Sequence, residues 1–128
     1  MDPISLSSGF SRLATDMANA RGQLSAQENR RLYPDHSWGN GFRERAETLD
    51  NYRTATIAMA PQAGQLITAL SADVRQLARV GGKLDIMASY RVPMAGGWAA
   101  TYDRPIADAL AAAEMLLHLG KRPGPKAA

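Results

Sequence analysis

The residue types best suited to acid–base chemistry in this chain stand together in one short stretch, Asp35-His36-Ser37. In a catalytic triad a carboxylate orients an imidazole, which takes a proton from a nucleophilic hydroxyl. Side chains that are neighbours in sequence do not reach one another in that order, and known triads are assembled from distant positions. We therefore expect His36 to be a turn residue that bonds its own loop, and we predict no catalytic residue.

Metal and cofactor chemistry has little support in the sequence. His36 and His118 are the only histidines, cysteine is absent, and no HxxxH, HExxH or calcium-loop pattern occurs. His118 falls in the last turn of a predicted helix, where the helix dipole favours a cation. Glu44 and Glu47 share a helix face, but arginines stand among them, as is typical of an ion-paired surface. We expect neither a metal nor a cofactor.

Arginines surround a short aromatic stretch, and this combination suits two kinds of partner. Protein interfaces favour Arg, Trp and Tyr as anchors, whereas arginine beside exposed rings also suits phosphate pairing and base stacking. Interspersed acids cancel much of the positive field, so we favour a protein partner and keep nucleic acid as the alternative. The aromatic residues are Tyr33, Trp38 and Phe42, and the predicted nucleic-acid contacts are Arg30, Arg31, Arg43, Arg45, Lys121 and Arg122.

Composition is that of an ordinary globular protein, with 45% hydrophobic residues, 21% charged residues and a formal net charge of +3. Half of the six cations after residue 82 lie in the last eight residues, so the positive surplus forms a tail rather than a stripe. The N-terminal stretch has no basic region or long apolar run, and no run of about 18 apolar residues occurs. We expect no membrane span and no recognisable secretion signal, and we place the protein in the cytoplasm or within a virus particle.

Apolar spacings of three and four predict helices over most of the chain. One helix is predicted over 10–32, after a loop-like N-terminal arm, and Gly22 is expected to mark a close helix crossing. Pro61 interrupts a second helical pattern over 43–80, which is therefore one kinked helix or two packed helices, and we favour two. Gly81-Gly82 is expected to end this pattern.

After the two glycines the apolar period changes to two. Apolar and polar residues alternate over 84–92, and Gly96-Gly97 turns the chain toward a second alternating stretch that includes Trp98 and Tyr102. This pattern predicts a β-hairpin over about 84–102.

The stretch 103–120 predicts a C-terminal helix that is apolar around most of its circumference. Asp103 can cap this helix and Gly120 can stop it. Only Asp108, Glu114 and His118 are expected to face water. A helix of this kind is usually covered on several sides, so it is either the core of the domain or a surface for another subunit.

These patterns predict a mainly α fold: three or four amphipathic helices, the hairpin and the apolar C-terminal helix. We expect one helical domain over 1–120 and a basic Pro/Gly tail over 121–128. The function we predict is that of a non-enzymatic structural or adaptor subunit of a larger assembly, such as a virus particle component. It would bind copies of itself or other subunits through Tyr33, Trp38, Phe42, Leu110 and Leu117. The alternative is a small nucleic-acid-binding protein that uses the region 30–53 and the tail.

Overall fold

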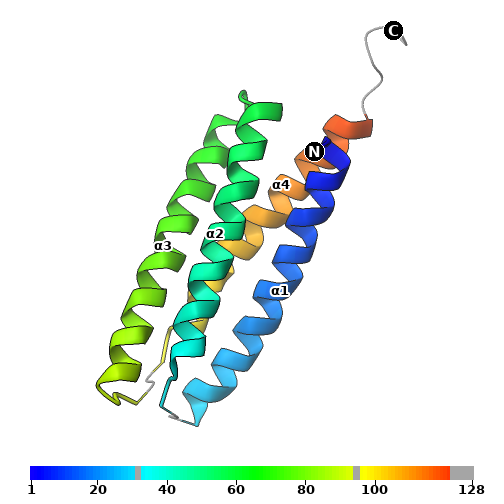
Figure 1. Cartoon of the computed structure of the whole chain (residues 1–128). Coiled ribbons are helices and arrows are strands. Elements are labelled where there is room, and N and C mark those ends of the chain that lie inside the picture. Colours follow the sequence, from blue (N-terminus) through cyan, green and yellow to red (C-terminus); the bar gives the residue numbers. More distant parts are fainter. Residues whose placement is uncertain (31–32, 94–95, 122–128) are drawn as a thin grey trace, which may run out of the picture.

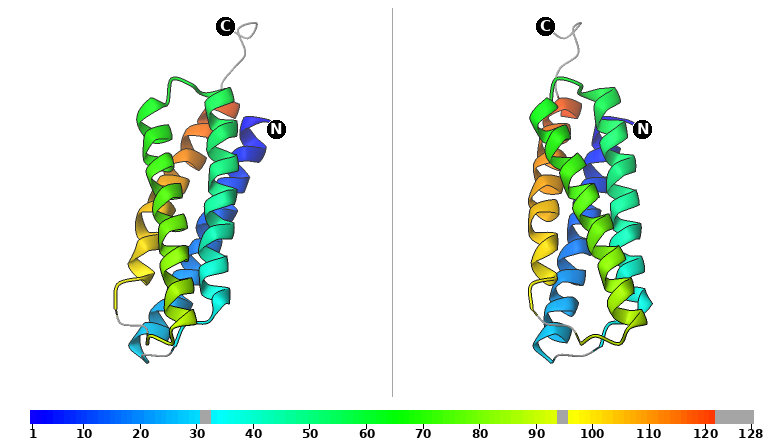
Figure 2. Two further views of the ribbon diagram at one scale, coloured as in Figure 1. Left: turned by 60° about the vertical axis from the view of Figure 1, so that its left-hand side comes forward. Right: turned by 90° about the vertical axis from the view of Figure 1, so that its left-hand side faces the viewer.

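Four antiparallel α-helices make up most of the structure. This structure is a computed structural model that describes residues 1–30, 33–93 and 96–121. Successive helices run in opposite directions along the bundle (Figure 1). α1 packs mainly against α4 and α2 mainly against α3, and the two pairs lie side by side (Figure 2). The elements are α1 (Pro3–Asn29), α2 (His36–Met59), α3 (Gly64–Ser89), the short 3₁₀ helix η1 (Ala99–Tyr102) and α4 (Asp103–Lys121).

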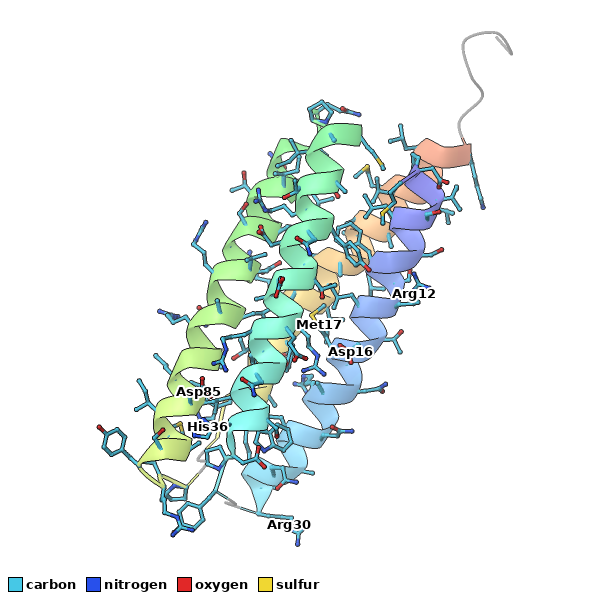
Figure 3. All side chains as sticks on the ribbon, viewed as in Figure 1. Arg12, Asp16, Met17, Arg30, His36 and Asp85 are labelled. Carbon is cyan, nitrogen blue, oxygen red and sulfur yellow. The ribbon has the colours of Figure 1, made fainter. Side chains whose placement is uncertain are left out.

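The core is built from side chains that recur every seven residues. Seven residues are close to two helical turns, so each series stays on one face of its helix, as in coiled coils and four-helix bundles. All of these side chains are at most 1% exposed, and Figure 3 shows one of them, Met17, pointing into the bundle. The series are Phe10, Met17 and Leu24 in α1; Phe42, Leu49 and Thr56 in α2; Leu70, Leu77 and Leu84 in α3; and Tyr102, Ala109 and Leu116 in η1 and α4.

Aspartates cap the first two helices. The Asp2 carboxylate accepts the Ser5 N–H at 2.8 Å, and the helix begins at the next residue, Pro3. Asp35 caps α2 in the same way through the Ser37 N–H, also at 2.8 Å. Residues 3–9, which we predicted to be a loop-like arm, are therefore the first turns of α1, because the Asp-Pro start signal lies ahead of the serines.

The pattern over 43–80 belongs to two packed helices, as we favoured. α2 ends at Met59 and α3 begins at Gly64, so the break surrounds Pro61. Proline cannot donate the backbone hydrogen bond that a continuous helix needs there.

The predicted β-hairpin is wrong, and the described part of the chain contains no strand. Residues 84–89 continue α3, and residues 99–102 form η1. The alternation over 84–92 does not reflect a buried strand face. Of its large apolar residues only Leu84 belongs to the core, whereas Ile86 is 60% and Tyr90 is 78% exposed. Residues 94 and 95 of the expected hairpin loop lie outside the described residues.

Gly81 lies within α3 and does not end it. A Cβ atom at Gly81 would lie 2.9 Å from the Gly39 carbonyl oxygen, and one at Gly39 would lie 2.7 Å from the Gly81 carbonyl oxygen. Glycine at both positions therefore lets the backbones of α2 and α3 touch. The close crossing that we predicted at Gly22 is not found, since a Cβ there would meet no atom of the described residues within 4 Å.

The C-terminal helix exists as α4, but it is not buried around its circumference. Its buried residues, on one side, are Pro105, Ala109, Ala112, Ala113 and Leu116. Leu110 is 50% and Leu117 is 37% exposed. The expectation failed because the other elements cover only this side of α4, so that apolar residues on its remaining surface, Leu110 and Leu117 among them, are exposed. Gly120 does not stop the helix but packs against Ile4, whose side chain would lie 2.5 Å from an added Cβ.

Adjacent glycines in α3 give a matched test of the crossing. Gly81→Ala should lower the free energy of unfolding by about 1–3 kcal/mol, because the new methyl group meets backbone atoms of α2. Gly82→Ala should raise it by up to about 1 kcal/mol, because alanine favours the helix and has open space there. Urea unfolding of both variants measures the difference, and equal effects would contradict the close crossing.

Candidate functional site

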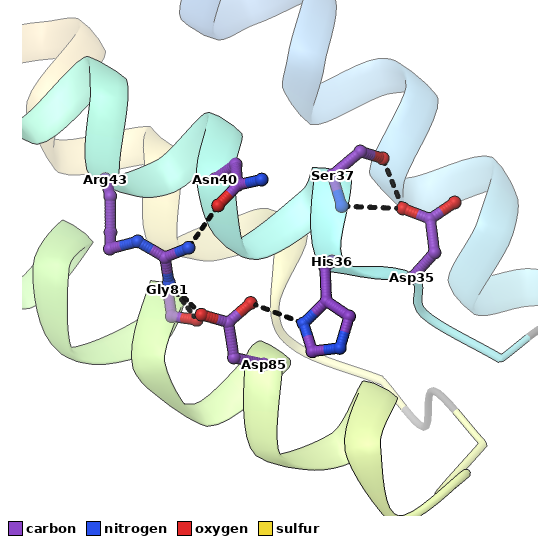
Figure 4. Close-up of polar contacts among 7 residues, drawn as sticks. All are labelled: Asp35, His36, Ser37, Asn40, Arg43, Gly81 and Asp85. Carbon is purple, nitrogen blue, oxygen red and sulfur yellow. Dashed lines mark hydrogen bonds and ion pairs between the residues drawn. The ribbon is translucent and has the colours of Figure 1, made fainter.

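The three residues of the Asp35-His36-Ser37 stretch do not form a triad. The Ser37 hydroxyl donates to Asp35, whereas His36 Nδ1 lies 3.2 Å from the carboxylate of Asp85 on α3 (Figure 4). The hydroxyl and the imidazole therefore face different carboxylates. His36 is the first residue of α2 and bonds α3, so our prediction that it bonds its own loop is wrong. The His36 side chain is 62% exposed, and Figure 3 shows it with Asp85 near one end of the bundle.

Asp85 joins α2 to α3 by binding Arg43 and His36 of α2. It accepts hydrogen bonds from Arg43 and His36, and Arg43 also donates to the Gly81 carbonyl at 3.3 Å and to Asn40 (Figure 4). Partial burial raises the pKa of Asp85, but the bonds from Arg43 and His36 outweigh this effect, so the pKa lies below its ordinary value. The cluster is an ion-paired clamp between helices.

Arg45 is also held inside the fold. Its Nε donates to Asp16 of α1 at 2.7 Å, and its Nη1 donates to the Tyr102 hydroxyl of η1 at 3.2 Å. The Tyr102 ring stacks on Phe42, with 4.4 Å between the ring centroids. Of the predicted nucleic-acid contacts, Arg43 and Arg45 therefore have internal carboxylate partners.

The other predicted site residues are spread over the molecule. Tyr33 is 62% exposed, Trp38 is partly buried against the core, and Phe42 is a core residue. Leu110 and Leu117 lie on the outer face of α4, far along the chain from these rings. Arg30 and Lys121 are exposed at helix ends, and Figure 3 shows Arg30 extending from the end of α1. Arg31, Arg122 and residues 123–128 of the tail lie outside the described residues.

The exposed side of α3 carries a row of cations that the sequence analysis missed. Arg75, Arg79 and Lys83 follow one another at intervals of four residues, and all three are exposed. Across the adjacent groove, Arg104 of α4 is exposed as well. None of these four cations forms an ion pair within the described ranges. We call them the α3 basic face. The four-residue spacing could have revealed it, but the predicted stop at Gly81-Gly82 separated Lys83 from the arginines.

Beside the α3 basic face, a groove of about 660 Å³ lies between α3 and the start of α4. Gln65, Thr68 and Gln76 of α3 face Thr101 and Arg104 across it. Asp73 also lines the groove, although this residue is only 3% exposed. Burial, together with a hydrogen bond to Asp108 and the charge of Asp108, raises the pKa of Asp73 to about 8, and Arg104 opposes the shift. Asp73 is therefore largely neutral at pH 7.

Within the described ranges, no three His, Asp or Glu side chains come together as a metal-ion site. No helix in those ranges has the length and apolarity needed to cross a membrane. Comparison of the chain with protein families, curated proteins and solved structures finds no match in any of the three.

The clamp at Asp85 predicts a pH-dependent contribution to stability. Asp85→Asn should lower the free energy of unfolding at pH 7 by about 1 kcal/mol, because Arg43 and His36 lose their carboxylate in a partly exposed cluster. The folded-state pKa of Asp85 is lowered, so this stabilisation is present above about pH 4 and is lost as the pH falls further.

Denaturant unfolding at pH 7 and at about pH 3 measures this contribution. The matched control is Asp50→Asn, which removes a pair with Arg53 inside one helix and should cost about 0.3–0.5 kcal/mol. A stability difference between wild type and Asp85→Asn that stays constant down to pH 3 would contradict the role of Asp85.

Proposed function

We propose that the protein is a non-enzymatic binding protein that contacts nucleic acid through the α3 basic face. The observation that supports this proposal is that Arg75, Arg79, Lys83 and Arg104 are exposed and have no carboxylate partner in the described ranges, whereas Arg43 and Arg45 do. Cations that neutralise phosphates supply most of the affinity of non-specific nucleic-acid binding.

The two carboxyl groups of α3 do little to oppose this field. Asp73 is buried and holds a proton at neutral pH, because its pKa is raised to about 8. Asp85 is engaged by Arg43 and His36 of α2. The exposed side of α3 is therefore more positive than the net charge of the chain suggests.

The spacing of the row also suits a phosphate backbone. Residues four apart on a helix are separated by about 6 Å along its axis, close to twice the 3.4 Å axial spacing of phosphates on one strand. Contacts to phosphates carry no sequence information directly, so we expect binding without sequence preference.

Neutralising the row tests this function. The triple variant Arg75→Gln, Arg79→Gln, Lys83→Gln should lose at least tenfold in affinity for a duplex oligonucleotide at low salt. The slope of log affinity against log salt should become shallower by about 2–3, because each lost phosphate contact removes about 0.9. Fluorescence anisotropy measures both quantities.

The matched control variant removes three exposed cations elsewhere, Arg12→Gln, Arg30→Gln and Lys121→Gln. It has the same net charge but should keep most of the affinity. Equal losses in the two variants, or no binding by wild type at low salt, would contradict the proposal.

A second candidate function is the assembly subunit predicted from the sequence, such as a virus particle component. It is favoured by the outer face of α4, where Ala107, Leu110, Glu114, Leu117 and Lys121 are all exposed. Their alternating spacing of three and four is that of a coiled-coil stripe, which pairs with a similar helix. The partner we propose for this face is α4 of a second copy of the chain.

Light scattering over a range of concentrations tests self-association. Leu110→Asp should leave the protein folded, since Leu110 is half exposed, and should reduce any dimer to monomer because a charge replaces an exposed leucine at the proposed contact. Ile86→Asp, at a residue 60% exposed on α3, is the matched control and should leave the mass unchanged. A wild-type monomer at all concentrations would exclude this candidate.

A further inference from the structure

Asp73 occupies a position where the other members of its series are hydrophobic. On α3 the buried side chains follow one another at alternating steps of three and four residues: Leu70, Asp73, Leu77, Val80 and Leu84. Asp73 is thus an ionisable group at a core position of the bundle. An ionised carboxylate is costly in such a place unless it is paired.

The partner of Asp73 is a second carboxyl group from the opposite helix. Asp108 of α4 acts on Asp73 and raises its pKa, and one oxygen of each carboxyl group, Oδ2, is buried without a hydrogen-bond partner among the described residues. Two carboxylates cannot hydrogen-bond to one another, because neither has a donor. One proton between them gives a donor and an acceptor.

We infer that Asp73 and Asp108 share a single proton that holds α4 against α3. Separation of the two carboxyl groups, which opens this Asp73–Asp108 joint, releases the proton. Closed, the joint satisfies both buried oxygens without ionising both acids. Open, the groove admits water and each acid ionises as an ordinary aspartate does. The inference is independent of the proposed functions, since it concerns only the joint between two helices.

Few charged groups act on the protonation of Asp73. Asp108 and Arg104, both on α4, are the charged groups that act on Asp73, while η1 contributes Ala100 and Thr101 to the same groove. Arg104 is exposed and its charge opposes the binding of the proton. Burial and the second carboxyl group outweigh Arg104, so the pKa of Asp73 is raised to about 8.

The sign of the response follows from proton linkage. The closed joint holds a proton that the open joint releases, between the ordinary carboxyl pKa near 4 and the raised value of about 8. The opening constant should therefore increase about tenfold per pH unit in this range and level off above it. The opening constant of the Asp73–Asp108 joint is therefore smallest at mildly acidic pH.

Amide hydrogen exchange of the helix segments around Asp73 and Asp108 tests the inference between pH 5 and 8, after correction for the intrinsic exchange rate. In wild type the opening constant should rise about tenfold per unit. In Asp73→Asn it should be independent of pH, because the Asn amide donates to Asp108 and releases no proton. Asp103→Asn, at an exposed carboxylate paired with Arg21, is the matched control and should keep the wild-type slope.

A wild-type opening constant that does not change with pH would overturn the inference, and so would the same slope in Asp73→Asn. An independent readout is the infrared carbonyl band of a protonated carboxyl group in wild type at pH 6. This band should disappear by about pH 10 and should be missing in Asp73→Asn. If Asp73→Asn does not fold, the infrared titration of Asp108→Asn decides, because removal of the second carboxyl should move the loss of the band to lower pH.

Discussion

The seven-residue interval between fully buried side chains is the constraint on which this fold depends. Because seven residues make nearly two helical turns, each helix presents one narrow apolar face to the bundle and leaves the rest of its circumference to solvent. The interval holds in α1, α2 and α3 and continues from η1 into α4. Cations, acids and exposed leucines on the other faces are therefore displayed on long, straight supports whose relative positions the core fixes.

The contact between Gly39 and Gly81 sets how α2 lies on α3. With no side chain between the two backbones, the helices approach until the carbonyl of each meets the other glycine. This register places Arg43 and His36 of α2 beside Asp85 of α3, one turn beyond the contact (Figure 4). The crossing thus gives Arg43 its partner inside the fold, whereas Arg75, Arg79 and Lys83 of α3 are exposed.

The sequence predicts the helical class, the break at Pro61 and the helix that becomes α4, because these depend on local periodicity and on proline. The end of α3 was missed because a glycine that serves a close helix contact looks the same in sequence as one that ends a helix. Arg43 and Arg45 are among the nucleic-acid contacts that the sequence predicts, because sequence proximity does not reveal distant carboxylates such as Asp16 and Asp85. A charged binding surface can be assigned only after the ion pairs within the fold are known.

The acid pair shows what a polar residue at a core position can provide. A pair of leucines at Asp73 and Asp108 would bury more apolar surface, and replacing buried polar groups by hydrophobic ones is often neutral or stabilising. A leucine, however, packs against many neighbouring faces, whereas a buried Asp73 needs a hydrogen-bond partner at a defined position. The Oδ2 atoms of both acids are buried, so a packing that turned Asp108 away from α3 would forfeit the shared proton that we propose satisfies them. The pair therefore selects the face that α4 presents to α3, and it makes this choice dependent on a proton.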